Sequence, residues 1–123
     1  MSQDLIRFMQ AFFLPVTGTF HDGVWRPAFD LYRTPDGWFV KVELAGVHVE
    51  DIKVFVRGRN LVIQGVRRDC GVEQGYRCYV MEVSYGRFER SFELPYDLES
   101  AQISVDYRDG MLFIRIVNEE ANP

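Results

Sequence analysis

Residues 101–116 read AQISVDYRDGMLFIRI. Hydrophobic and polar residues alternate on both sides of Asp109-Gly110, a pair that is typical of the tight turn of a β-hairpin. The alternation puts one set of side chains on a common face: Ile103, Val105, Tyr107, Leu112, Ile114 and Ile116. The stretch therefore predicts two antiparallel strands with one buried face.

The same period of two extends back along the chain to about Phe29 and forward to Val117. It occurs in WFVKVEL (38–44), DIKVFV (51–56), NLVIQGV (60–66) and RFERSFEL (87–94). RGRN (57–60) predicts a second hairpin turn, because Gly58 and Asn60 tolerate positive φ. No part of 29–117 keeps a helical period, so we predict an all-β fold, an immunoglobulin-like antiparallel β-sandwich.

The two ends of the chain differ from this zone. Residues 1–28 form an arm whose apolar residues at 5, 8, 9, 12 and 16 follow helical spacing, interrupted by Pro15 and Gly18. Residues 118–123 (NEEANP) form a short polar tail. The apolar run of the arm is shorter than the roughly twenty residues that cross a bilayer, and it lacks the basic start of a signal peptide. We therefore expect a cytoplasmic protein with one domain at 29–117.

Residues that could support catalysis or bind a metal are few and isolated. His21 and His48 have no cysteine, histidine or carboxylate at ligand spacing, and no nucleotide-binding or nucleophile motif occurs. Cys70 and Cys78 are expected to be free thiols, with a redox role at a subunit contact as the alternative. The net charge of −4, with scattered basic residues, does not indicate nucleic-acid binding. We expect no enzyme activity, cofactor or metal.

Four segments resemble motifs of the α-crystallin domain, the core of small heat-shock proteins of bacterial and plant type. WRPAFD (25–30) matches W-x-P-x-x-D, and LAGVHVEDI (44–52) matches L-P-G-x-x-x-E-D-I except that Ala45 replaces the proline. YGRFERSFELP (85–95) matches Y-G-x-F-x-R-x-F-x-L-P. ISVDYRDGMLFIRI (103–116) resembles A-x-x-x-x-G-V-L, with Met111 where valine is common. The four occur in order and at the family's spacing, over about residues 25–117.

The resemblance implies a sandwich of seven to nine strands and an ATP-independent chaperone, a holdase. Such a protein binds exposed hydrophobic segments of unfolding proteins and prevents their aggregation under stress. The alternative is a CS-domain-like co-chaperone or adaptor that binds one specific folded partner.

The resemblance also implies a dimer. Residues 67–86 stand where members of the family carry a long loop with an extra strand, which is exchanged onto the edge of the partner. Tyr76, Arg77 and Tyr79 are the candidates for this strand, because aromatic side chains suit strand addition; a mobile hairpin without a partner is the alternative. Arg90 falls where the family carries an arginine, and we expect it to pair with an acidic residue within the dimer or across its interface.

The chain departs from the family pattern at its end. The usual extension with an I-x-I motif is not recognisable, because Ile114-Arg115-Ile116 belongs to the last strand and NEEANP has no aliphatic anchor. We expect a homodimer or small oligomer, with co-assembly with a longer small heat-shock subunit as an alternative. The vacant groove between the DIKVFV and ISVDY strands would be lined by Ile52, Val54, Ile103 and Val105.

The arm carries the side chains that we expect to bind clients: Leu5, Ile6, Phe8, Met9, Phe12, Phe13 and Leu14. Burial of one such side chain stabilises by about 1.5–3 kcal/mol, so an exposed set of them favours contact with other hydrophobic surfaces. Met and Phe adapt to partners of many shapes. The alternative is that the arm packs permanently on its own sandwich.

Overall fold

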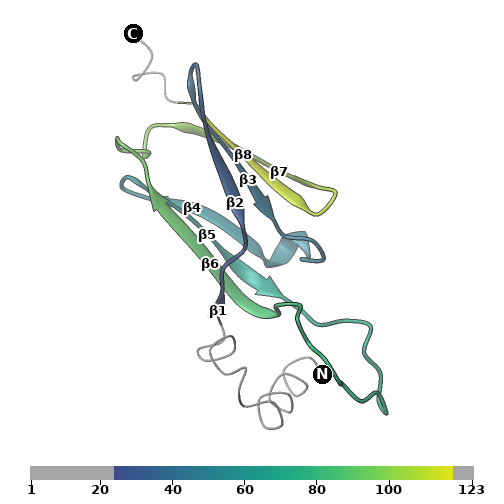
Figure 1. The fold of residues 1–123 in the computed structure, drawn as a ribbon. Coiled ribbons are helices and arrows are strands. Elements are labelled where there is room, and N and C mark those ends of the chain that lie inside the picture. Colours follow the sequence, from purple (N-terminus) through teal and green to yellow (C-terminus); the bar gives the residue numbers. More distant parts are fainter. Residues whose placement is uncertain (1–23, 118–123) are drawn as a thin grey trace.

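The computed structural model describes residues 24–117, which form two stacked sheets of four strands each (Figure 1). The first sheet has the order β1 (Val24–Trp25), β6 (Gly86–Glu93), β5 (Asn60–Arg67), β4 (Ile52–Arg57). The second has the order β2 (Phe29–Thr34), β3 (Gly37–Glu43), β8 (Met111–Val117), β7 (Gln102–Arg108). A 3-10 turn, η2 (Val49–Asp51), precedes β4. The predicted β-sandwich is confirmed.

The hairpin predicted from residues 101–116 is β7–β8. Asp109 and Gly110 have φ values of 54° and 74°, as a two-residue turn of this kind requires. In the β4–β5 hairpin Gly58 also has positive φ, at 63°, but Asn60 pairs with Arg57 in the ladder. The hairpin turn predicted at RGRN is confirmed, and it consists of residues 58 and 59.

The core fills the space between the sheets with the inward side chains of the alternating runs. Thirteen hydrophobic residues of the described chain are buried: Val40, Val42, Leu44, Val47, Leu61, Val62, Ile63, Phe88, Leu94, Leu98, Leu112, Ile114 and Ile116. Ile114 and Ile116 are 0% exposed, so the I-x-I letters of β8 belong to the core, as the alternation predicts.

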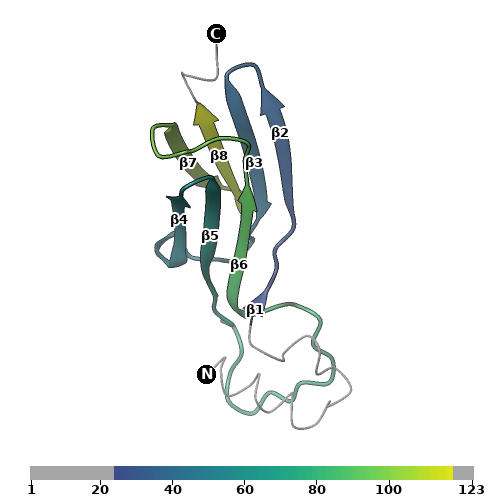
Figure 2. The ribbon, with the colours of Figure 1, turned by 90° about the vertical axis from the view of Figure 1, so that its left-hand side faces the viewer.

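β1 connects the two sheets at one end of the sandwich. It pairs with β6 in parallel, with Val24 opposite Arg87, and the chain then crosses to β2 on the other sheet. The long loop between β5 and β6, residues 68–85, projects from this same end in both views (Figures 1 and 2). The start of the described chain and the loop are therefore neighbours.

Candidate functional site

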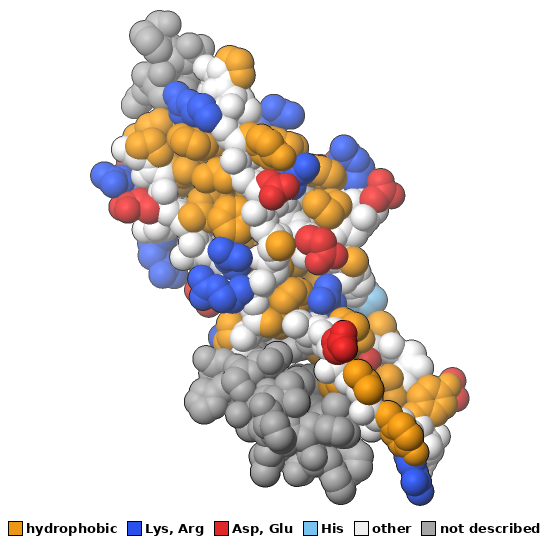
Figure 3. Space-filling view, viewed as in Figure 1, with side chains coloured by type: hydrophobic (Ala, Val, Ile, Leu, Met, Phe, Trp, Pro, Cys, Tyr) orange, Lys and Arg blue, Asp and Glu red, His pale blue; other side chains and the backbone are white. Residues whose placement is uncertain are grey.

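One side of the sandwich has two open strand edges. β2 is the outer strand of its sheet, and β6 is covered only at Arg87 and Phe88, by β1. Between them the rings of Phe29 and Phe92 stack at 4.8 Å, and Leu31 is 38% exposed. Hydrophobic side chains gather over this part of the surface (Figure 3). Open edges with hydrophobic neighbours are templates for pairing with another strand.

Arg90 lies on β6 beside these edges. Its guanidinium donates to the carbonyl of Pro27 at 3.0 Å and lies 4.5 Å from the ring centre of Phe29. Its Nε is buried and has no hydrogen-bond partner among residues 24–117. Burial lowers the pKa of Arg90, and the nearby charge of Arg26 adds to this effect. The expected acidic partner is not present within the described part of one chain; a partner across an interface stays a prediction.

The loop of residues 68–85 carries its large hydrophobic side chains outward. Tyr76 is 60% exposed, Tyr79 is 76% and Val80 is 74%, and Arg77 is exposed beside them. The projecting loop shows hydrophobic side chains along its length (Figure 3). No strand forms between β5 and β6 in the single chain, so the predicted exchanged strand would have to form on a partner.

Two consecutive arginines tie the base of this loop to the sandwich. Arg67 donates to the carbonyls of Ser84 at 2.9 Å and Ala45 at 2.8 Å, and its guanidinium lies 4.2 Å from the ring centre of Trp25. It therefore joins both ends of the loop to the turn after β3. Sequence reasoning missed this role, because an arginine at the end of a strand gives no local signal of its distant partners.

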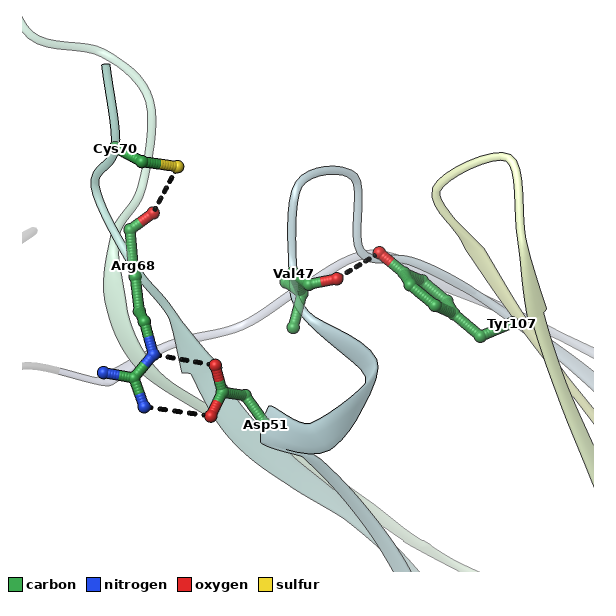
Figure 4. Close-up of polar contacts among 5 residues, drawn as sticks. All are labelled: Val47, Asp51, Arg68, Cys70 and Tyr107. Atoms are coloured by element: carbon green, nitrogen blue, oxygen red, sulfur yellow. Dashed lines mark hydrogen bonds and ion pairs between the residues drawn. The ribbon is translucent and has the colours of Figure 1, made fainter.

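Arg68 points the other way and binds Asp51 of η2 through two hydrogen bonds of 2.8 and 3.0 Å (Figure 4). These bonds lower the pKa of the Asp51 carboxyl. Cys70 follows on the same segment, with its thiol turned toward the Arg68 carbonyl at 3.8 Å (Figure 4). The acidic residue of the E-D-I motif thus fixes the start of the loop.

The four residues predicted to line a groove lie on two edge strands, β4 and β7, one in each sheet. Ile52, Val54 and Ile103 are partly buried against the core, whereas Val105 is 48% exposed. Tyr107, on the same face of β7, places its hydroxyl 2.7 Å from the carbonyls of both Leu44 and Val47. That contact ties β7 to the turn after β3.

The other residues considered for catalysis or metal binding are not grouped into a site in the described part of the chain. His48 precedes η2, and Cys70 and Cys78 are free thiols. No group of three or more His, Cys, Asp or Glu positioned to hold a metal ion occurs within residues 24–117, nor does any helix there have the length and apolar character to span a membrane. His21 and the seven hydrophobic arm residues of 5–14 lie outside the described residues.

Comparison with known proteins agrees with the fold and the motifs. A model of the Hsp20/alpha crystallin family matches residues 30–123. The chain belongs to this family. The matched range includes the loop, Arg90 and all of β2 except Phe29, whereas Trp25 and Pro27 precede it.

Individual members of the Hsp20/alpha crystallin family are moderately similar. Spore protein SP21 of Stigmatella aurantiaca is 31% identical over 90 residues, 73% of this chain and 53% of that protein. Small heat shock protein C2 of Rickettsia felis is 30% identical over 94 residues, which are 76% of this chain and 61% of that protein. The crystal structure of hspA from Xanthomonas axonopodis has a TM-score of 0.66 and 30% identity, over 77% of this chain and 95% of that one. The chain thus spans just over half to about three-fifths of these two curated relatives.

Proposed function

We propose that this member of the family is an ATP-independent holdase of the cytoplasm, which binds hydrophobic segments of unfolding proteins and keeps them from aggregating. The observation that carries the proposal is the match of residues 30–123 to the Hsp20/alpha crystallin family. The sandwich also leaves large hydrophobic side chains exposed, from Leu31 on the open β2 edge to Tyr79 and Val80 in the loop, for contact with other chains. Hydrophobic surface of this kind gains free energy when it contacts exposed apolar segments of another chain. Such binding needs no catalytic group.

The three segments distinguished in the sequence have different roles in this proposal. Residues 1–28 form the main client-binding arm through their hydrophobic side chains at 5–14, the sandwich of 29–117 presents it, and 118–123 is a polar tail. The β4–β7 groove with Ile52, Val54, Ile103 and Val105 is a second site for an extended segment. That segment could belong to a client or to a longer small heat-shock subunit.

The assembly unit is a dimer or a small oligomer. The loop of one chain, with Tyr76, Arg77 and Tyr79, pairs with the open β2 edge of its partner, and Arg90 gains an acidic partner there. Two features support this arrangement: β2 has an unpaired edge, and the Nε of Arg90 is buried without a partner in the described chain. Arg90 is partly buried and has no counter-charge in the described chain, so an interface that supplies one is favoured.

The holdase is tested with a heat-labile client whose aggregation is followed by light scattering without ATP. The wild type should suppress scattering in roughly stoichiometric amounts. The variant Leu5→Ser/Phe8→Ser/Phe12→Ser should lose most of this effect, while the matched control Gln3→Ser/Gln10→Ser/Thr19→Ser, with three polar changes in the same arm, should retain it. A folded wild type that gives no suppression would contradict the proposal.

The dimer is tested separately by the mass in solution. Multi-angle light scattering should give twice the mass of one chain or a small multiple of it. Tyr76→Ser/Tyr79→Ser should shift the mass toward the monomer. Val49→Ser is the control, because Val49 is also exposed, at 62%, but lies in η2 outside the loop. Equal masses for all three proteins would exclude the loop as the dimer contact.

A further inference from the structure

The arm joins the sandwich directly beside the base of the loop. Val24, the first described residue, pairs with Arg87, just after the loop ends at Tyr85. The indole nitrogen of Trp25 donates to the carbonyl of Gly86 at 3.1 Å. In both views β1 and the loop share one end of the sandwich (Figures 1 and 2). The point where residues 1–23 join the described chain is therefore next to the loop base and three strands away from the β4 edge.

The loop base contains a hollow of about 340 Å³ that is open to solvent. Its lining combines the charged residues Glu43, Arg67 and Arg68 with Ala45, Gly46, Cys70, Val83 and Tyr85. Val83, in this lining, is 53% exposed. Hydrophobic side chains at the edge of an open hollow form a site that an apolar segment can cover.

Asp69 does not line the hollow itself, but it lies in the chain between Arg68 and Cys70, which both do, and one oxygen of its carboxyl group lacks a partner in the described chain. Its Oδ2 is buried and has no hydrogen-bond partner among residues 24–117. Burial raises the pKa of this carboxyl, as expected for a carboxylate that lacks compensation. The two adjacent cations are already engaged, Arg67 with two carbonyls and Arg68 with Asp51. A buried, unpaired acceptor favours a cationic donor from elsewhere.

We propose that the N-terminal arm docks onto the loop base of its own chain, with Arg7 paired to Asp69 and the hydrophobic residues of 5–14 covering Val83. Arg7 is the only Lys or Arg in residues 1–23. The seventeen-residue separation from Val24 spans up to roughly 56 Å when extended, so reach is no obstacle. A short tether also gives the arm an effective concentration on the order of millimolar at this site.

The docked arm is an autoinhibited state of the holdase, and this consequence rests on the proposed function. Arm residues that cover Val83 are not free for clients, so a client must displace the arm before it binds. The two ends of the loop then serve different contacts. The tip, with Tyr76 and Tyr79, faces a partner subunit, and the base, with Asp69 and Val83, holds the arm.

The native thiols provide the test. Cys70 lines the hollow, whereas the thiol of Cys78 lies near the carbonyl of Val80 and outside the lining of the hollow. Alkylation of the full chain by iodoacetamide is followed by mass spectrometry, and the Cys70 rate is divided by the Cys78 rate. The ratio should rise several-fold in Leu5→Ser/Phe8→Ser/Phe12→Ser and should stay at the wild-type value in Gln3→Ser/Gln10→Ser/Thr19→Ser. An unchanged ratio in the first variant would overturn the proposal.

The ion pair is tested by a double-mutant cycle on the same ratio. Arg7→Glu should raise the ratio in the wild-type background and should have no further effect in the Asp69→Asn background. Equal effects of Arg7→Glu in both backgrounds would exclude Asp69 as the partner. Circular dichroism spectra and unfolding midpoints check that each variant is folded.

Two further measurements distinguish docking on the same chain from docking of a partner's arm, and the docking proposal from the holdase proposal. The dilution series uses the Cys70 rate alone, because Cys78 lies between Arg77 and Tyr79 of the proposed dimer contact. The Cys70 rate should not depend on protein concentration; if protection of Cys70 is lost on dilution, the occupant is the arm of a partner and docking on the same chain is wrong. Arg7→Glu keeps all seven hydrophobic residues of the arm and should suppress client aggregation at least as well as the wild type. If the thiol ratios change as expected but no variant or wild type suppresses aggregation, the docking stands and the holdase fails.

Discussion

The interior of the sandwich and the loop of residues 68–85 use the same kinds of side chain in opposite ways. Ile114 on β8 is 0% exposed, in a strand with a neighbour on each side. Tyr79 in the loop is 76% exposed and belongs to no strand. Folding of one chain thus buries the hydrophobic side chains inside the sandwich and leaves those of the loop exposed to solvent. The difference separates the residues that stabilise the fold from those available to other chains.

The largest expected effect contrasts these two sites directly. Ile114→Ala should lower the free energy of unfolding by about 2–5 kcal/mol, because it removes buried methyl groups and leaves a cavity. Tyr79→Ala should change it by less than about 0.5 kcal/mol once values are extrapolated to low protein concentration. Urea denaturation followed by circular dichroism measures both. A cost for Tyr79→Ala as large as that for Ile114→Ala would place the loop in the folded core.

The next effect concerns the boundary between the two regions, at Arg67. Arg67→Met keeps the apolar stem but removes the bonds to Ser84 and Ala45 and the charge over Trp25. We expect a loss of about 1.5–3 kcal/mol, typical of hydrogen bonds to a charged group, and faster tryptic cleavage within the loop. Arg59→Met, which breaks only an exposed ion pair with Glu93, is the control and should cost at most about 1 kcal/mol. Equal losses would mean that Arg67 does not anchor the loop.

The sandwich was predictable because most of the long strands have a period of two, although β5 buries Leu61, Val62 and Ile63 in succession. The alternation around Asp109-Gly110 gives β7, the turn and β8 without any knowledge of the rest of the molecule, and the buried positions of β8 follow from it. Short edge strands are less visible. β1 has two residues, too few to show a period. In β2 the alternation of hydrophobic and polar residues is weak, and Leu31 is partly exposed.

The contacts of the candidate site were predictable only in part. The loop and Arg90 were found through the resemblance to a family, but the contacts of Arg90 with Pro27 and Phe29 come from segments some sixty positions away in the chain. The contacts of Arg67 and Tyr107 likewise join distant turns. Such pairings depend on how the sheets stack, which local periodicity does not specify. The strand expected in the loop needs an edge that its own chain does not provide.

A smaller effect is expected at the opposite edge, where Tyr107 ties β7 to the turn after β3. Tyr107→Phe removes a hydroxyl that lies 2.7 Å from the carbonyls of Leu44 and Val47. The free energy of unfolding should fall by about 0.5–1.5 kcal/mol, the usual net value of a hydrogen bond. Tyr32→Phe, in an exposed residue of β2, is the control and should be near neutral. If both variants are equally stable, the hydroxyl of Tyr107 does not hold the turn, and the well-packed region is smaller than the burial pattern indicates.

The smallest expected effect is the pH dependence of the Asp51–Arg68 link between η2 and the loop. The hydrogen bonds from Arg68 lower the pKa of Asp51 below its ordinary value of 3.8 in the folded chain. A carboxyl with a lowered folded-state pKa stabilises the protein above its unfolded pKa, and this stabilisation is lost as the pH falls through the folded-state pKa. Asp51→Asn should therefore melt below the wild type near neutral pH, and the gap should close in acid.

Arg68→Gln is the matched variant, because it removes the same pair from the other side. It should show the same pH dependence, and the double variant should melt like either single one if the two residues act only through each other. The Arg68 side chain is 60% exposed, so high salt should narrow the gap at neutral pH. A gap that persists in acid would mean that Asp51 acts through the backbone of η2 instead of through the loop. In that case Arg67 alone would connect the loop to the folded region, and the boundary between the two regions would lie at the end of β5.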